Sequence, residues 1–409
     1  MIILIKIAWR SIWRSKLRSS VVIFAIASGL LGGLFSSAWM NGMAMQRVKN
    51  TFAFEIGHVQ MHHPDYSENM DVKKTIVDTR KKISALSSTE GVKSVTQRLR
   101  ITGMAATANK NTGVNIIGVD PVTEKAVFEL YQRIDSASGN FFESNAKNQI
   151  VISKALANEL NAKLKSKIVL TFQDFNGEIT GAAFKVVGLY KTDNNPWDKM
   201  HVFVKNDDLR SVLEVPDDQS HEIVMLLDDY EQAGALAVLL QTRNPGTKVE
   251  GWAEISPYLS LMSGYMDTMM GLFMAIILGA LGFGIVNTML MVVLERTREL
   301  GMLMAIGMTK KRIFIMIMLE TIFLALVGGI IGEILSVLCI AHFGRTGIDL
   351  SSVAEGMEAV GYSANTYPML EGYRYVQITL LVVITGILAS VYPALKALKL
   401  HPAEAIRSN

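Results

Sequence analysis

Three histidines lie close together in the sequence and raise the question of a metal site. His58 and His62 are four residues apart, a spacing that on a helix would let both imidazoles bind one ion. Residues 58–62, HVQMH, read as a short strand instead, and on a strand the two rings would lie about 13 Å apart. We therefore expect His58, His62 and His63 to be structural, and we predict no metal ligands.

Two acidic residues, Glu320 and Glu333, lie within a long apolar segment. A carboxylate is costly in lipid, so both side chains should face protein. A proton relay would need a partner acid, histidine or lysine in another apolar segment, and the sequence offers none.

The sequence also excludes several kinds of site. It contains no Gly-x-x-x-x-Gly-Lys-Ser/Thr motif, so no phosphate loop and no cofactor are expected on this chain. The single cysteine, Cys339, excludes an internal disulfide framework. A net charge of +3 over 409 residues is too small to indicate the basic surface of a nucleic-acid-binding protein. No residues support an enzymatic role.

Four long apolar segments dominate a chain that is 50% hydrophobic and 19% charged. A helix of about 20 apolar residues matches the hydrocarbon core of a bilayer. Buried helices of soluble proteins average only about 11–12 residues and keep a polar face. We therefore predict four transmembrane helices, over residues 21–40, 268–294, 313–341 and 375–395.

The charges orient these predicted spans. Residues 1–20, the loop 295–312 and the tail 396–409 together hold thirteen basic and three acidic residues. The positive-inside rule places all three in the cytoplasm. The large insertion 41–267 and the acidic loop 342–374 then lie outside.

The N-terminal region allows other interpretations. A basic start followed by an apolar run also fits a cleaved signal peptide, but the run is long and an even number of spans favours retention. Residues 2–17 alternate bulky apolar and basic side chains, which predicts an amphipathic helix with Trp9 and Trp13 at headgroup depth. A simple extension of the first span is the alternative.

The insertion 41–267 is large enough to bury its own core. Short β-branched runs bounded by Gly, Asn and Asp predict strands at residues 58–62, 114–118, 167–171, 184–188, 201–204 and 222–226. Helices are expected at residues 153–160, with Ser153 as N-cap, and at residues 230–242. This pattern predicts an α+β domain of two subdomains.

Small residues recur every four positions on three of the predicted spans. They are Ala25, Gly29, Gly33 and Ser37 on the first, Ala275 and Gly279 on the second, and Gly328 and Gly332 on the third. Such spacing lets helices approach closely. It fits packing within the chain and also a seam between two subunits.

The loop 295–312 carries an apolar stripe between charged ends. The stripe comprises Leu300, Leu303, Met304 and Gly307, and the charges are those of Arg296, Arg298 and Glu299. An ordinary solvated loop needs no such stripe. A short helix of this kind can fit a groove on a partner protein, so we predict docking.

This loop resembles the FtsX-like/MacB-like permease family of ABC transporters, which includes the lipoprotein-releasing LolC/LolE subunits. The family pattern E-R-x-x-E-[IL]-G-x-x-x-A-[IL]-G, followed by a basic cluster and a Glu in the third span, is matched by Glu295, Arg296, Glu299, Leu300, Gly301, Ala305, Gly307 and Glu320. Residues 7–19, 389–397 and 402–407 also match. Residues 117–121 and 184–188 resemble the external domain of the family more weakly.

The resemblance implies an α-helical membrane protein with four transmembrane helices and a large MacB-like periplasmic α+β core domain of two subdomains. It places the protein in the bacterial inner membrane, with the domain in the periplasm. It also implies a coupling helix that docks on a separate ABC ATPase subunit, where ATP and Mg²⁺ would bind. That helix would comprise Glu295, Arg296, Arg298, Glu299, Leu300, Gly301, Met304, Ala305 and Gly307.

Family members work as dimers, so a second permease subunit, identical or related, is expected. The function that the resemblance favours is the release of lipoproteins from the inner membrane, driven by ATP through mechanotransmission to the periplasmic domain, with a periplasmic acceptor possible. MacB-like efflux of peptides, toxins or drugs is an alternative. A third is an FtsX-like scaffold that activates cell-wall hydrolases, whose external domain is usually much smaller.

Overall fold

The computed structural model describes residues 2–14, 16–66, 70–142 and 146–398. The chain divides into two compact units. The helical unit comprises Met1–Ala44, Gly264–Asp349 and Asn365–Asn409, and the sheet unit comprises Met45–Ser263 and Leu350–Ala364.

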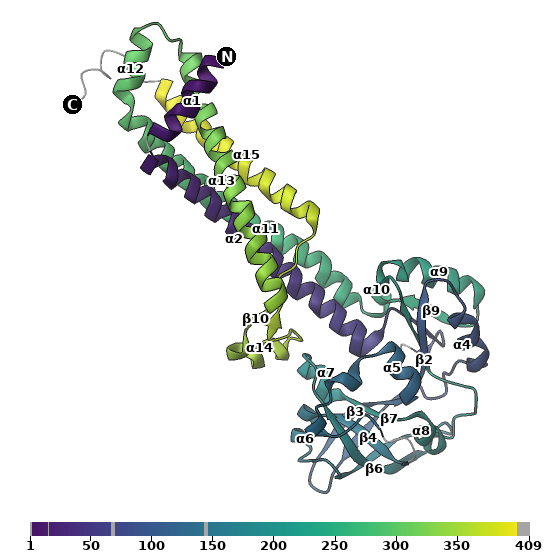
Figure 1. Ribbon diagram of the computed structural model, residues 1–409. Helices are drawn as coiled ribbons and strands as arrows, with labels where there is room; N and C mark the ends of the chain where they lie inside the picture. Colours follow the sequence, from purple (N-terminus) through teal and green to yellow (C-terminus); the bar gives the residue numbers. More distant parts are fainter. Residues whose placement is uncertain (1, 15, 67–69, 143–145, 399–409) are drawn as a thin grey trace. The chain divides into compact units, whose positions relative to one another are not determined.

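The helical unit consists almost entirely of helices. They are α1 Ile2–Arg14, α2 Lys16–Thr51, α11 Pro257–Glu295, α12 Thr297–Ala305, α13 Lys310–Thr346 and α15 Gly372–Leu398 (Figure 1). In the described part of the chain, α2, α11, α13 and α15 are long and apolar enough to cross a membrane. A short antiparallel pair, β10 Ile348–Asp349 and β11 Asn365–Thr366, precedes α15. The predicted tail lies outside the described residues from residue 399 onward.

Two helices extend well past the predicted spans. Helix α2 continues beyond residue 40 to Thr51, and α11 begins at Pro257 rather than at residue 268. Hydropathy marks only the apolar part of a helix, whereas backbone hydrogen bonding continues until a residue interrupts it. Proline suits the first position of α11 because that position needs no N–H partner.

Close approach between helices depends on two of the predicted small residues. A Cβ on Gly332 would lie 2.9 Å from both the Cα and the carbonyl oxygen of Ala27, and a Cβ on Gly328 would lie 3.0 Å from the carbonyl of Ile23. These distances leave room for hydrogen only, so α2 and α13 pack backbone to backbone. The core around them is fully buried at Ile26 and Leu30.

The sheet unit is built on one continuous sheet. Its strands are β1 Val59–His62, β2 Val92–Ala106, β3 Asn111–Val119, β4 Gln149–Ser153, β5 Lys167–Gln173, β6 Ile179–Tyr190, β7 His201–Lys205, β8 Glu222–Leu227 and β9 Lys248–Gly251. The order is β3-β7-β4-β6-β5-β2-β8-β1-β9, and β2 also pairs with β3. That extra pairing closes β3, β7, β4, β6, β5 and β2 into a barrel.

The long strand β2 joins two subdomains. Its first half, from Val92 to Arg98, pairs with β8, and its second half pairs with β3 and β5. The barrel has its own core, which includes Leu99 and Phe184, and a second core around Met61 and Met225 lies in the β8-β1-β9 region. The two predicted subdomains therefore share one strand.

The sheet unit also contains short helices. They are α4 Thr79–Ser87, α5 Pro121–Val127, α6 Lys154–Glu159, α7 Asn195–Met200, α8 Asn206–Leu213, α9 Ala233–Arg243, α10 Trp252–Ile255 and α14 Ala354–Ala359. Single turns lie at η1 Phe52–Ile56, η2 Leu130–Arg133, η3 Ser136–Ser138, η4 Tyr230–Gln232 and η5 Ser351–Val353. Ser153 accepts a hydrogen bond from the Leu156 amide, as expected of the N-cap of α6.

Candidate functional site

Helix α12, which carries the predicted coupling motif, has two different faces. Leu300 and Gly301 are buried, and Leu303 and Met304 pack against the core of the helical unit. The exposed side chains include Arg298, Met302 and Ile306, of which Ile306 is 85% exposed. Leu300, Gly301 and Met304 therefore also hold α12 against its own spans, and their contact with a partner stays a prediction.

The face of α12 that remains open to a partner is the opposite one. Besides Arg298, Met302 and Ile306, it includes Ala305 and Gly307. Two apolar side chains beside a guanidinium on a short helix form the kind of surface that fits a groove. Glu295, just before α12, is also exposed.

Arg296 is the centre of a polar cluster that links α12 to the spans. Its Nη1 donates to both carboxylate oxygens of Glu320 on α13, at 3.1 and 3.0 Å, and its Nε donates to Glu299 at 3.1 Å. The Glu320 carboxylate also accepts from the Ser11 hydroxyl on α1 at 2.9 Å. Arg14 contacts Glu299 at 3.2 Å.

The pairs in this Arg296 cluster differ in burial. The Glu320 side chain is 6% exposed and that of Arg296 is 18% exposed, so this pair lies mostly out of water. Arg14 is 80% exposed, and its ion pair with Glu299 contributes little. The contact that matters structurally is therefore Arg296–Glu320, which ties the start of α12 to α13, with α1 attached through Ser11.

The other predicted residues lie at different places in the helical unit. Gly29 and Gly33 of α2 pack against Leu281 and Met274 of α11. Ser37 on the same helix is buried, Ala25 is half-buried, and Ala275 is exposed. Gly279 has no heavy atom within 4 Å of a Cβ built on it. Glu333 is half-buried on α13.

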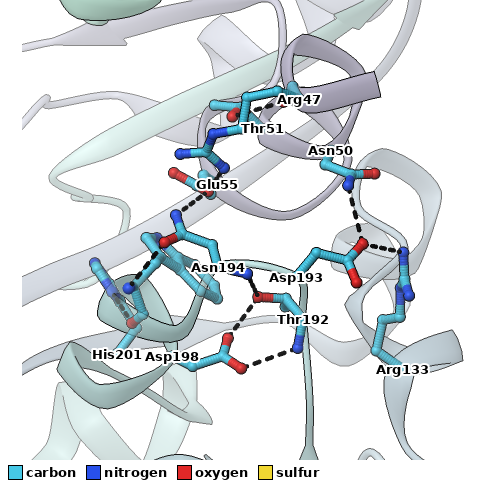
Figure 2. Close-up of polar contacts among 11 residues, drawn as sticks. Arg47, Asn50, Thr51, Glu55, Arg133, Thr192, Asp193, Asn194, Asp198 and His201 are labelled. Atoms are coloured by element: carbon cyan, nitrogen blue, oxygen red, sulfur yellow. Dashed lines mark hydrogen bonds and ion pairs between the residues drawn. The ribbon is translucent and has the colours of Figure 1, made fainter. Parts of the chain in front are cut away.

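A second polar cluster, within the sheet unit, surrounds Asn194 (Figure 2). Asn194 caps α7 by accepting from the Trp197 amide, and its Nδ2 donates to Glu55 of η1 at 2.8 Å. Arg47 on the last turns of α2 donates to the same carboxylate oxygen of Glu55 at 3.2 Å. Asn194 therefore binds the end of the first long helix to the domain.

Asp193 makes a parallel connection beside Asn194. Its Oδ2 accepts from Asn50 of α2 at 3.0 Å and from Arg133 of η2 at 3.4 Å (Figure 2). The loop before α7 thus contacts α2 through one side chain and η1 through the next. The sequence does not predict this Asn194 cluster, since Asp193 and Asn194 are 143 and 139 positions from Asn50 and Glu55 and match no local motif.

The same loop is also bound by the segment that connects α13 to α15. Lys191 donates to Glu358 of α14 at 2.8 Å, and the Glu358 side chain is 16% exposed. The Arg47 guanidinium packs over the backbone of Gly361, where a Cβ would lie 2.8 Å from its central carbon. Residues 191–194 therefore contact both the end of α2 and the segment 350–364.

The histidines considered as metal ligands have protein partners. His62 Nε2 lies 2.6 Å from Glu250 Oε2, and His58 Nδ1 accepts the Leu227 amide at 3.0 Å. No group of three or more potential ligands that could hold a metal ion occurs among the described residues. The two rings serve to pair β1 with its neighbours.

Burial shifts the pKa values of two residues in and just after α7, Asp198 and His201. Burial raises the pKa of Asp198 to about 6, although the hydroxyl and amide of Thr192 donate to its carboxylate and oppose the shift. Burial lowers the pKa of His201 to about 4; this ring stacks on Trp197. Asp198 therefore binds its proton more tightly in the fold than in the unfolded chain, whereas His201 binds its proton less tightly.

The two shifts have opposite effects on stability as pH falls. Asp198 adds stability as pH falls from its folded pKa of about 6 towards its unfolded pKa of 3.8. The contribution of neutral His201 is complete above its unfolded pKa of 6.5 and is lost as pH falls towards its folded pKa of about 4. Removing one group should expose the effect of the other.

Substituting Asp198→Asn should make the stability of the α7 region fall more steeply as pH falls. The variant lacks the carboxyl group whose protonation opposes this loss, so only the destabilising protonation of His201 remains. Hydrogen exchange of peptides covering residues 190–201 between pH 5 and 7.5, corrected for intrinsic rates, measures this. Asp207→Asn, at an exposed position, is the control. An identical pH dependence in Asp198→Asn and the wild type would contradict the assignment.

Two family models together match most of the chain. Residues 19–242 match the MacB-like periplasmic core domain, and residues 271–402 match the FtsX-like permease C-terminal family. The uncharacterized ABC transporter permease YknZ of Bacillus subtilis is 26% identical, with 98% of each chain covered. The lipoprotein-releasing system transmembrane protein LolC of Xylella fastidiosa is 22% identical over 71% of this chain and 72% of its own.

Other relatives and solved structures match smaller shares. The macrolide export ATP-binding/permease protein MacB of Bdellovibrio bacteriovorus is 27% identical over 78% of this chain but only 47% of its own length. Among solved structures, the periplasmic region of MacB from Actinobacillus actinomycetemcomitans covers 53% of this chain and 98% of its own, with 12% identity and a TM-score of 0.35.

Proposed function

The chain belongs to the FtsX-like, MacB-like family of ABC transporter permeases, and from this membership we propose that it drives the release of lipoproteins from the inner membrane. A separate ABC ATPase subunit would dock on the open face of α12 and hydrolyse ATP. A second permease subunit, identical or related, would complete the transporter. The domain would lie in the periplasm, with both termini in the cytoplasm.

The observation that carries this proposal is the Arg296–Glu320 ion pair. A partner bound to α12 can do mechanical work on the spans only if α12 is fixed to them. The pair provides this fixation by joining α12 to α13 at 3.0 Å with little exposure to water. Movement of α12 by an ATPase would therefore displace α13.

The Asn194 cluster connects the end of α2 to the sheet unit, as the Arg296 cluster connects α12 to α13. Helix α2 runs without interruption from Lys16 to Thr51. In its last turns, Asn50 binds the loop before α7 directly, and Arg47 binds it through Glu55. A displacement of α2 along its axis would be passed to the domain through these contacts. This is the mechanotransmission that the proposal requires.

Lipoprotein cargo is favoured by the extent of the similarity. LolC is matched over nearly the same share of both chains, as is LolE of Haemophilus influenzae, with 78% of each covered. The MacB of Bdellovibrio bacteriovorus is matched over less than half its length. MacB-like efflux remains the second candidate, because the domain itself matches the MacB-like core model.

Native mass spectrometry of the complex, purified from its own membrane together with its ATPase, tests the proposal. Release of lipoproteins predicts a co-purified triacylated polypeptide that dissociates when ATP is added. A bound peptide or small molecule without acyl chains would instead assign efflux. A cell-wall hydrolase bound without any transported ligand would assign the scaffold function and contradict transport.

A further inference from the structure

Helix α1 carries three parallel rows of side chains, each with a spacing of four residues. One row packs against the core of the helical unit, the next is apolar and exposed, and the third is basic and exposed. In that order, the rows are Leu4, Ala8 and Ile12; Ile5, Trp9 and Trp13; and Lys6, Arg10 and Arg14. Because each residue turns a helix by about 100°, the three rows lie side by side around α1.

The apolar row is open although it adjoins the packed one. Trp9 is 43% exposed and Trp13 is 54% exposed, and their rings meet edge to face with centroids 6.0 Å apart. Proteins place indoles at the polar boundary of a bilayer, because the ring is apolar and its N–H donates a hydrogen bond. The apolar row therefore suits the headgroup region of a membrane.

The basic row lies next to it. Lys6 and Arg10 are exposed, and the side chain of Arg14 is 80% exposed. Arg14 contacts Glu299 at 3.2 Å, and an ion pair this exposed contributes so little that a phosphate could replace the carboxylate at small cost. Cations beside exposed indoles are the pattern of a helix that lies in the interface of an anionic membrane.

The contacts of α1 with α13 place it at the start of an uncharged stretch (Figure 1). The rings of Trp9 and Phe323 meet edge to face with centroids 5.4 Å apart, and Ser11 donates to Glu320. After Glu320, α13 has no charged residue until Glu333. Because α13 is a candidate span, α1 lies where polar contacts end and the bilayer core begins.

The neighbouring helices favour lipid over an acidic protein as the occupant of this surface. Helix α1 ends at Arg14, and the long helix α2, which is also a candidate span, begins at Lys16. Lipid is therefore already present beside Trp9 and Trp13, whereas a protein partner would have to displace it.

We propose that the two exposed rows of α1 bind anionic phospholipids of the leaflet at the N-terminal end of α2, with phosphates on Lys6, Arg10 and Arg14 and the indoles among the headgroups. A choline headgroup fits this surface less well, because it brings a cation that the basic row repels. The inference requires only that α2 and α13 cross a membrane, and it is independent of the cargo.

Native mass spectrometry of the full chain, offered equal amounts of palmitoyl-oleoyl phosphatidylglycerol and phosphatidylcholine, tests this proposal. The wild type should retain phosphatidylglycerol in preference to phosphatidylcholine. The double variant Lys6→Gln/Arg10→Gln should lower this preference at least fivefold, about the factor expected for one cation near an anionic surface. Glutamine keeps the helix propensity of α1, so the fold should persist.

The matched control is Lys310→Gln/Lys311→Gln, which removes two exposed basic residues from the first turn of α13. These residues lie about 14 Å further along α13 than Glu320, away from the level of α1. The control should therefore change the preference by less than about twofold, the remainder expected from the general field of the protein.

A second variant tests the apolar row without changing any charge. Trp13→Gln removes the more exposed indole and leaves the basic row intact. It should lower retention of both lipids alike and leave their ratio unchanged, and it should melt as the wild type does. Unchanged retention in Trp13→Gln would contradict the placement of the indoles among the headgroups.

Other results would overturn the lipid assignment as a whole. They are equal retention of both lipids by the wild type, and equal effects of the two double variants on the preference. Loss of the ATPase from Lys6→Gln/Arg10→Gln with an unchanged lipid ratio would assign the basic row to a protein partner. None of these results depends on whether lipoproteins co-purify with the complex, so the proposed function is judged separately.

Discussion

Replacing Arg296 with methionine should leave an ATPase that still hydrolyses ATP but no longer drives release. The substitution removes the cation from a Glu320 carboxylate that is 6% exposed and that would keep its hydrogen bond from the Ser11 hydroxyl. Breaking a buried pair from one side costs about 3–5 kcal/mol. Helix α12 would then be held only by its apolar contacts with the core, and movement of the ATPase would reach the spans less effectively.

The measurement is the ATPase rate of the reconstituted complex with and without cargo, together with the amount of cargo released per ATP. Arg296→Met should lower release at least tenfold while co-purification of the ATPase persists, because the open face of α12 is unchanged; tenfold corresponds to about 1.4 kcal/mol. The double variant Arg296→Met/Glu320→Gln should recover part of the activity, since it leaves no unpaired charge.

Arg312→Met is the matched control, because Arg312 is an exposed arginine outside the Arg296 cluster. Normal coupling in Arg296→Met, or loss of coupling of the same size in Arg312→Met, would show that the ion pair does not carry the force. Loss of the ATPase from the purified complex would instead show that Arg296 is part of the docking surface.

Replacing Gly332 with leucine should prevent the helical unit from assembling. The added side chain would start 2.9 Å from the backbone of Ala27, and backbone cannot rotate away as a flexible side chain can. Overpacking at such a contact costs about 1–3 kcal/mol or more. We expect loss of the monodisperse protein in detergent and a lower melting temperature for any that remains.

Gly279→Leu provides the comparison on the exposed face of α11. Nothing lies within 4 Å of its Cβ position, so the chain should fold and melt as the wild type does. If this face forms the seam with the second permease subunit, Gly279→Leu should reduce dimerisation, measured by size-exclusion chromatography with light scattering. Unchanged melting of Gly332→Leu would contradict the packing argument, and an unchanged dimer in Gly279→Leu would contradict the seam.

Periodic features of the structure could be predicted from the sequence. Four spans follow from four apolar segments, and six strands follow from short β-branched runs, because both signals lie within a few consecutive residues. The helical extensions of α2 and α11 could not be predicted in the same way. Residues 41–51 and 257–267 are polar enough to end a hydropathy segment, and nothing in them ends a helix.

The two polar clusters also differ in how far the sequence predicts them. Arg296 and Glu320 are 24 positions apart, and both belong to the family pattern, so the sequence alone draws attention to them. Asn194 and Glu55 are 139 positions apart, and only the closed sheet brings them together. The orientation of α12 is also beyond the pattern, because an apolar stripe does not say whether it faces the chain's own spans or a partner.

The segment 350–364 has a geometric consequence for the domain. The loop before α7 is held both by the end of α2, through Asn50, and by α14, through Glu358. All three belong to one compact unit, so a force along either α2 or the segment 350–364 would reach the same loop.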